Sequence, residues 1–115
     1  MISFKYRSYV KGGITLVVKD YFNSTVEKED CQMNYFYRMT EGEFKKGQAY
    51  GIEVERQDIK NGSLINIERN SVKLISTNEE KVKKLFDLIS KNNVSPIHLI
   101  DVIGEYVDEY VSDFI

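Results

Sequence analysis

The hydrophobic periodicity of this chain changes at about residue 76, and this change constrains its fold more than any other feature. Before it, apolar and polar residues alternate in several stretches, as in β-strands that bury one face. After it, apolar residues recur at every third or fourth position, as in amphipathic helices. A run of strands followed by a run of helices predicts an α+β fold.

The alternating part predicts five or six antiparallel strands in a meander-like sheet. Expected strands cover 2–10, 14–18, 31–39, 49–59 and a segment from residue 64, and 72–75 is either a sixth strand or the bent end of the fifth. The polar stretches 23–30 and 41–48 are expected to be loops. Asn61-Gly62 predicts a tight hairpin, because both residues tolerate positive φ.

That hairpin also predicts a register. A two-residue turn pairs Ile59 with Leu64, and it is expected to place Ile65 and Ile67 on the same face as Ile52. This face also carries Val54, so it would be the buried side of the sheet. The other side is expected to face water.

Two helices are expected to pack on one face of this sheet. Thr77 and Glu80 fit a capping box at the start of the first helix, and Ser95-Pro96 marks the start of the second. The second helix has a long apolar stripe, which consists of Leu99, Ile100, Ile103, Tyr106, Val107, Tyr110, Val111 and Phe114. The prediction is a single domain over 1–115, with the sheet in 1–75 and the helical pair in 76–115.

Charge is distributed unevenly along the chain. The net charge is only −2, which gives no general attraction for nucleic acid or an anionic membrane. Residues 95–115, however, carry five acidic side chains and no Lys or Arg. These acidic residues are expected to form a solvated face or a surface for a basic partner, rather than a metal site.

The sequence offers little for catalysis. His98 is the only histidine and Cys31 the only cysteine, and no phosphate-binding or Cys-x-x-Cys motif occurs. His98 is expected to be a partly buried capping or packing residue, with a catalytic role as the alternative. Cys31 is expected to be a buried core residue, with a reactive thiol as the alternative. We therefore expect a non-enzymatic protein without a metal or cofactor.

The cysteine content and hydropathy also bear on location. A lone cysteine is typical of a reducing compartment. No segment approaches the roughly 20 apolar residues that span a bilayer, and no apolar run suited to a signal peptide begins the chain. The expectation is a cytoplasmic protein with no membrane association.

The leading functional hypothesis is binding to another protein or to a second copy of the chain. The apolar stripe of the last helix extends beyond the length that the preceding helix could cover, so an exposed apolar patch is expected at Tyr106, Tyr110, Val111 and Phe114.

The alternative hypothesis places single-stranded nucleic acid or a small ligand on an aromatic and basic sheet face, with nucleic acid the less favoured occupant. Aromatic side chains stack bases and basic side chains contact phosphates in such sheets. The outer-face candidates are Lys5, Arg7, Tyr9, Phe36 and Arg38, and further aromatic candidates are Tyr6, Tyr35 and Tyr37.

Part of the chain also resembles a known family. The segments Tyr50-Gly51-Ile52-Glu53, Glu79-Glu80-Lys81-Val82 and 94–103, the last with its Pro-x-His-Leu-x-Asp-Val-Ile pattern, carry the resemblance. The segments are similar to small proteins of low-GC Gram-positive, largely clostridial, bacteria that form a domain of unknown function. The resemblance implies a bacterial cytoplasmic protein, and it implies no catalytic or binding residues.

Overall fold

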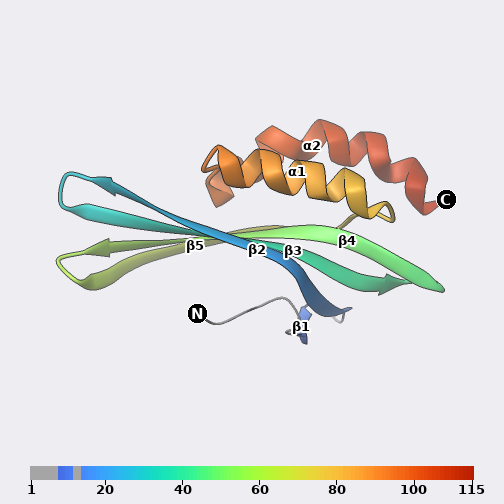
Figure 1. The fold of residues 1–115 in the computed structure, drawn as a ribbon, viewed down its shortest axis with the longest axis horizontal. Helices are drawn as coiled ribbons and strands as arrows, with labels where there is room; N and C mark the ends of the chain where they lie inside the picture. Colours follow the sequence, from blue (N-terminus) through green and yellow to red (C-terminus); the bar gives the residue numbers. More distant parts are fainter. Residues whose placement is uncertain (1–7, 12–13) are drawn as a thin grey trace.

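The fold has two layers, a long twisted antiparallel sheet and a pair of helices on one of its faces (Figure 1). The computed structural model describes residues 8–11 and 14–115, with side chains from residue 15 onward. The strands are β1 (Ser8–Lys11), β2 (Ile14–Lys28), β3 (Cys31–Phe44), β4 (Gly47–Lys60) and β5 (Ser63–Ser76). They lie in the order β1-β2-β3-β4-β5, and every neighbouring pair is antiparallel.

The α+β fold, with an antiparallel meander followed by two C-terminal helices, is confirmed. Four long strands, β2 to β5, make the meander, and the four-residue β1 adds a short fifth strand beside β2 at one edge. Residues 72–75 form the end of β5 and not a separate strand. Most of the expected first strand, 2–7, lies outside the described residues.

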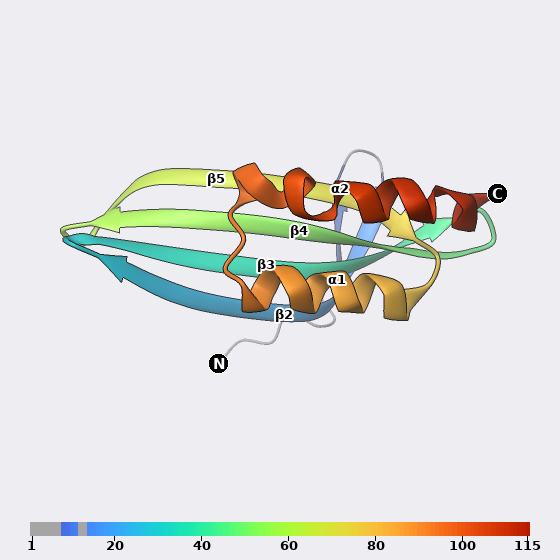
Figure 2. The same cartoon turned by 90° about the horizontal axis from the view of Figure 1, so that it is seen from above.

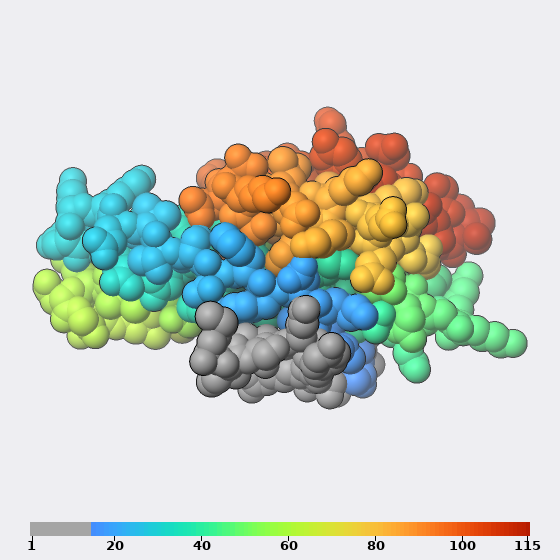
Figure 3. Space-filling model, viewed as in Figure 1, coloured from blue at the N-terminus to red at the C-terminus, as the bar shows by residue number. Residues whose placement is uncertain are grey.

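The two expected loops at 23–30 and 41–48 are wrong. β2 and β3 pair as far as Lys28 and Cys31, and β3 and β4 pair as far as Phe44 and Gly47. Each turn is only two residues long and has positive φ at its first residue, Glu29 or Lys45. The β2–β3 and β3–β4 turns lie at opposite ends of the sheet. Polar residues can form these strand ends because the sheet extends beyond the helices into solvent, most clearly at the end with the β2–β3 turn (Figure 3).

The Asn61-Gly62 hairpin is confirmed in its turn and in its first pairs. Ile59 pairs with Leu64, and both turn residues have positive φ. The expected placement of Ile65 and Ile67 is wrong, because the register shifts between Asp58 and Ile59. Ile67 therefore pairs with Gln57, on the face opposite Ile52 and Val54, and it is exposed, as is Ile65.

A second irregularity lies in the same strand pair, at Gly51. Tyr50 pairs with Ser76 and Ile52 with Val72, so three residues of β5 stand opposite this one glycine. A Cβ atom at Gly51 would overlap the backbone carbonyl oxygens of Val72 and Lys73. The bulge therefore requires a residue without a side chain.

The helical layer consists of α1 (Glu79–Lys91), the short helix η1 (Pro96–His98), α2 (Leu99–Tyr110) and the short helix η2 (Val111–Phe114). The two α-helices lie side by side and run in opposite directions, α1 on β3 and β4 and α2 on β5 (Figure 2). The N-cap of α1 is Asn78 and not Thr77, since the Asn78 side chain accepts a hydrogen bond from the backbone N–H of Lys81.

The core lies between these layers. Its fully buried residues include Tyr37, Ile52, Val54, Ile75, Val82, Phe86, Ile89, Leu99 and Ile103. The Tyr37 hydroxyl donates a 3.0 Å hydrogen bond to the Val94 carbonyl oxygen, and this bond fixes the connection between α1 and η1 over the sheet. Burial raises the pKa of the Tyr37 hydroxyl well above its usual value, so it stays protonated as a donor.

Candidate functional site

The four residues expected to form an interface do not lie in one exposed patch. Tyr106 and Val111 are exposed. Tyr110 packs against the core and holds the Lys81 Nζ atom 4.8 Å from its ring centroid. The Phe114 ring packs edge-on against Phe44 of β3, with the centroids 4.9 Å apart. The Tyr106 ring also lies 6.4 Å from the Tyr110 ring, so three of the four make ring contacts within the chain.

A different set of apolar side chains is exposed along η1, α2 and the start of η2. Ile97 is 69% exposed, Ile100 50% and Val111 53%, although Leu99 and Ile103 are completely buried. Two of these exposed residues directly follow residues that pack in or against the core. Ile100 follows Leu99, and Val111 follows Tyr110. We call the set Ile97, Ile100, Val107 and Val111 the α2 stripe; Val107 is half-buried at its centre.

The α2 stripe lies on the side of α2 that faces away from α1. One step along a right-handed helix rotates a side chain by about 100°, so residues 100 and 111 point in a different direction from residues 99 and 110, which pack on the core. Figure 2 shows α1 on one side of α2 and the edge strand β5 on the other side of the molecule. Neighbouring contacts agree with this placement. The Asn70 side chain of β5 donates a 3.1 Å hydrogen bond to the Pro96 carbonyl oxygen, and Ile97 borders an open hollow of about 290 Å³ beside Glu68 and Arg69.

The opposite side of α2 is tied to α1. Lys81 of α1 forms a 3.0 Å ion pair with Asp113, which also accepts a hydrogen bond from the Ser76 hydroxyl. The Ser76 hydroxyl and the Lys81 ammonium group hold the pKa of the Asp113 carboxyl below its usual value. The side toward α1 is therefore engaged within the chain.

The outer face of α2 is acidic. Asp101, Glu105, Asp108 and Glu109 are all exposed. Asp101 lies 3.4 Å from the His98 ring, and the other three have no ion-pair partner within the part of the chain that the structure describes. Asp101 directly follows Ile100 and Asp108 directly follows Val107, so these two carboxylates border the α2 stripe.

The residues of the alternative hypothesis are divided between the two faces of the sheet. Tyr35 and Tyr37 lie under the helices and are buried, with their rings stacked 6.2 Å apart. Phe36 and Arg38 alternate with them and lie on the opposite face. Tyr6, Lys5 and Arg7 lie outside the described residues, as does the side chain of Tyr9.

Arg38 is neutralised within the sheet. Its Nε atom lies 3.0 Å from Glu53, and its Nη2 atom lies 3.3 Å from Glu55. Glu55 also accepts a 2.9 Å hydrogen bond from Arg69. Burial alone would raise the pKa of Glu55, but hydrogen bonds from Gln57 and Arg69, together with the nearby arginine charges, lower it overall. Arg38 thus carries no free charge for a phosphate.

A second charged cluster lies on the helix face, beside η1. Arg56 forms ion pairs with Asp58 at 3.0 Å and with Glu68 at 3.2 Å. Its Nη1 atom also donates a 3.5 Å hydrogen bond to the Ser95 hydroxyl. The expected capping role of that hydroxyl is therefore wrong, because Ser95 caps no backbone group of η1 and instead binds an arginine of β4.

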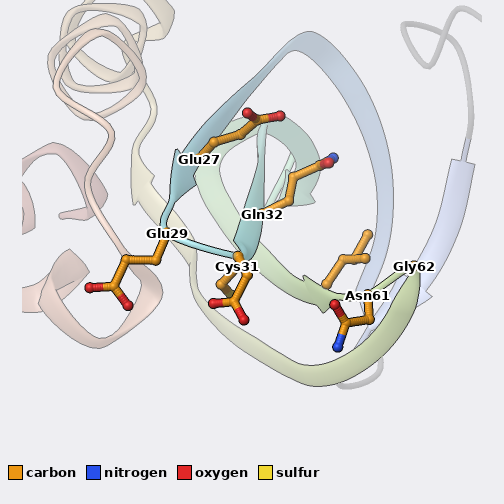
Figure 4. Close-up of a pocket in the computed structure, with 8 residues that line it drawn as sticks. Glu27, Glu29, Cys31, Gln32, Asn61 and Gly62 are labelled. Carbon is orange, nitrogen blue, oxygen red and sulfur yellow. The ribbon is translucent and has the colours of Figure 1, made fainter.

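The expected environments of His98 and Cys31 are also wrong. The His98 side chain is 64% exposed, and it makes no capping hydrogen bond. Cys31 is half-buried at the β2–β3 turn, where it lines an open hollow of about 270 Å³ with Glu27, Gln32 and Asn61 (Figure 4). Within residues 15–115, no group of three or more His, Cys, Asp or Glu side chains is arranged to hold a metal ion.

The α2 stripe was missed by the sequence interpretation for a specific reason. The sequence interpretation groups Ile100 with Leu99 in a single apolar stripe, although adjacent residues point about 100° apart on a helix. The spacing of 100, 107 and 111 indicates a second apolar line beside the core line of 99, 103 and 110. This phase difference was the available signal.

Comparison with known proteins gives a family and no function. No helix in the described ranges has both the length and the apolarity needed to span a membrane. No curated protein and no solved structure matches the chain. The sequence model of one family, described as "Family of unknown function (DUF6514)", matches residues 17–109, which is most of the chain. The chain therefore belongs to this family of unknown function.

Proposed function

We propose that this chain is a small non-enzymatic protein that acts by binding another protein through the α2 stripe. The observation that supports the proposal is the exposure of Ile97, Ile100 and Val111 on one side of a helix whose other sides are engaged with the sheet, with α1, or with water through its carboxylates. Contiguous exposed apolar side chains rimmed by polar groups are typical of interaction sites.

The chemistry of the remaining surface supports binding over catalysis. His98 is the single histidine, and its exposed ring lies 3.4 Å from the exposed Asp101 carboxylate. The hydroxyl of the neighbouring Ser95 accepts a hydrogen bond from Arg56. The nucleic-acid alternative receives less support, because Tyr35 and Tyr37 are buried and Arg38 is paired with two glutamates.

We place this protein in the bacterial cytoplasm. The lone Cys31 fits a reducing compartment. The resemblance of residues 50–106 to proteins of low-GC Gram-positive bacteria suggests a clostridial or related source.

Affinity capture from a lysate of the source organism tests the proposal. Tagged wild type is compared with Ile100→Ser/Val111→Ser, which makes the α2 stripe polar, and with Leu88→Ser, which makes the same change at an exposed position on α1. We expect a partner that is enriched with wild type and with Leu88→Ser. The amount of this partner that is recovered should be at least about tenfold lower with the double variant. A partner retained equally by the double variant, or no partner and no self-association of wild type, would contradict the proposal.

A further inference from the structure

We infer that the partner segment on the α2 stripe is a basic amphipathic helix. This inference rests on the proposed function and adds the chemistry of the partner. It uses two features of α2 that are independent of each other, the spacing of the apolar side chains and the sign of the charges beside them.

The spacing fits a helical partner. Ile100, Val107 and Val111 follow one line of α2 for about 16 Å, at the rise of 1.5 Å per residue. Gly104 also lies on this line, and a partner side chain can occupy the space that a larger residue would fill there. A partner helix with apolar residues at steps of three and four can pack them between the side chains of the α2 stripe and at Gly104. Such a helix makes contact along the whole length of the stripe.

The charges select a basic partner. Asp101 and Asp108 border the α2 stripe on the side away from β5, and neither α2 nor η2 contains a Lys or Arg. On the β5 side, Arg69 lies beside Ile97, but it is paired with Glu55 at 2.9 Å. The rim of an interface is where charge complementarity guides association and rejects partners of like charge. An acidic or neutral helix would match the apolar line but would leave these carboxylates without partners or facing like charge.

The same charges disfavour a second copy as the occupant. Two α2 helices packed stripe to stripe would bring their acidic borders together. The Lys-rich α1 of a second copy is a poor substitute, because Lys81 is paired with Asp113, and Lys83 is paired with Asp20 and Asp87. Among the described residues of α1, this leaves Lys84 and Lys91 as the lysines without an ion pair, two turns apart. Self-association is therefore an outcome that would overturn the inference.

Fluorescence anisotropy with a labelled synthetic peptide tests the inference. The probe is an amphipathic Leu/Lys helix of about 18 residues, or five turns. The matched controls are a Leu/Glu peptide with the same leucine positions and a scrambled Leu/Lys peptide. We expect saturable binding of the ordered Leu/Lys peptide alone, with affinity that falls as NaCl rises from about 50 to about 300 mM.

Three variants assign the binding to the site. Ile100→Ser/Val111→Ser should weaken binding at least about tenfold, because it removes the apolar contacts. Asp101→Asn/Asp108→Asn should weaken it about three- to tenfold with little change of the fold, because both side chains are exposed. Leu88→Ser on α1 should leave the affinity unchanged.

The outcomes separate this inference from the proposed function. Failure of the Leu/Lys peptide to bind, or equal binding by Asp101→Asn/Asp108→Asn, overturns the basic-helix inference. The Leu/Glu peptide could bind instead, and Ile100→Ser/Val111→Ser could abolish that binding. This result would support the α2 stripe as an interaction surface but would overturn the inference that its partner is basic. A dimer in native mass spectrometry that the same double variant dissociates identifies a second copy as the occupant and likewise overturns the inference.

Discussion

The helices α1 and α2 lie on the same face of the same sheet, yet they use their surfaces differently. α1 buries Val82, Leu85, Phe86 and Ile89 and pairs Lys81 and Lys83 with carboxylates from other parts of the chain. α2 fully buries only Leu99 and Ile103, and it leaves a line of apolar side chains and a row of carboxylates exposed.

This difference separates what the fold needs from what it leaves available. The contacts of α1 are completed within the chain, so changes to them should act on stability. The free side of α2 contributes little to the core, so changes there should act on association. Substitutions matched between the two helices test this division.

The largest effect is expected from Phe86→Ala. The Phe86 ring is 2% exposed in the centre of the core, and its removal leaves a cavity under α1. We expect the free energy of unfolding in urea to fall by about 3–5 kcal/mol. Leu88→Ala, two residues along the same helix and 38% exposed, is the control and should lose less than about 1.5 kcal/mol. Equal losses would show that α1 does not pack as described.

A similar loss is expected from Gly51→Ala, which tests the sheet beneath the helices. The new methyl group would overlap two backbone carbonyl oxygens of β5, and backbone cannot move aside as a flexible side chain can. We expect a loss of about 3 kcal/mol in urea unfolding. Gly104→Ala on α2 is the control, because its methyl group would meet the Ile100 side chain at an ordinary 3.6 Å. That variant should gain up to about 1 kcal/mol from helix propensity.

A smaller loss is expected from Tyr37→Phe. The change keeps the ring in the core but removes the donor to the Val94 carbonyl oxygen. We expect a loss of about 1–3 kcal/mol, because the carbonyl oxygen of the half-buried Val94 loses its hydrogen-bond donor. Tyr106→Phe, at an exposed position of α2, should leave the free energy of unfolding unchanged. A neutral Tyr37→Phe would mean that water replaces the hydroxyl at Val94.

The acid dependence of stability should change with Asp113→Asn. The folded state lowers the pKa of the Asp113 carboxyl below its ordinary value of 3.8, because the carboxylate accepts from Ser76 and Lys81. The carboxylate thus adds stability above about pH 4 and loses that contribution as the pH falls through its lowered pKa. We expect wild type to lose more stability than Asp113→Asn between about pH 5 and about pH 2. Parallel pH profiles would refute this.

Much of the fold could be predicted from the sequence, because it depends on local patterns. The change of periodicity at about residue 76 indicated the order of strands and helices, and Asn61-Gly62 located a turn and its first pair. The register beyond that pair could not be predicted, because it depends on a bulge at Asp58 and Ile59 that no turn residue marks. The long polar ends of β2 and β3 were missed because pairing with a neighbouring strand, and not burial, keeps them extended.

The candidate site could be predicted only in outline. The sequence indicated that α2 has more apolar surface than one neighbouring helix can cover. It did not show which residues the sheet and α1 cover, since contacts such as Phe114 with Phe44 join positions 70 residues apart. Tyr110 and Phe114 are therefore half-buried against other parts of the chain, and Ile97 and Ile100 are exposed.

The most direct test of the division between the helices is urea unfolding of Ile100→Ser/Val111→Ser beside wild type and Phe86→Ala. If the α2 stripe is a binding surface that the fold does not require, the double variant should lose less than about 1.5 kcal/mol, because both side chains are about half exposed already. A loss as large as that of Phe86→Ala would contradict this account, because it would make the α2 stripe part of the core.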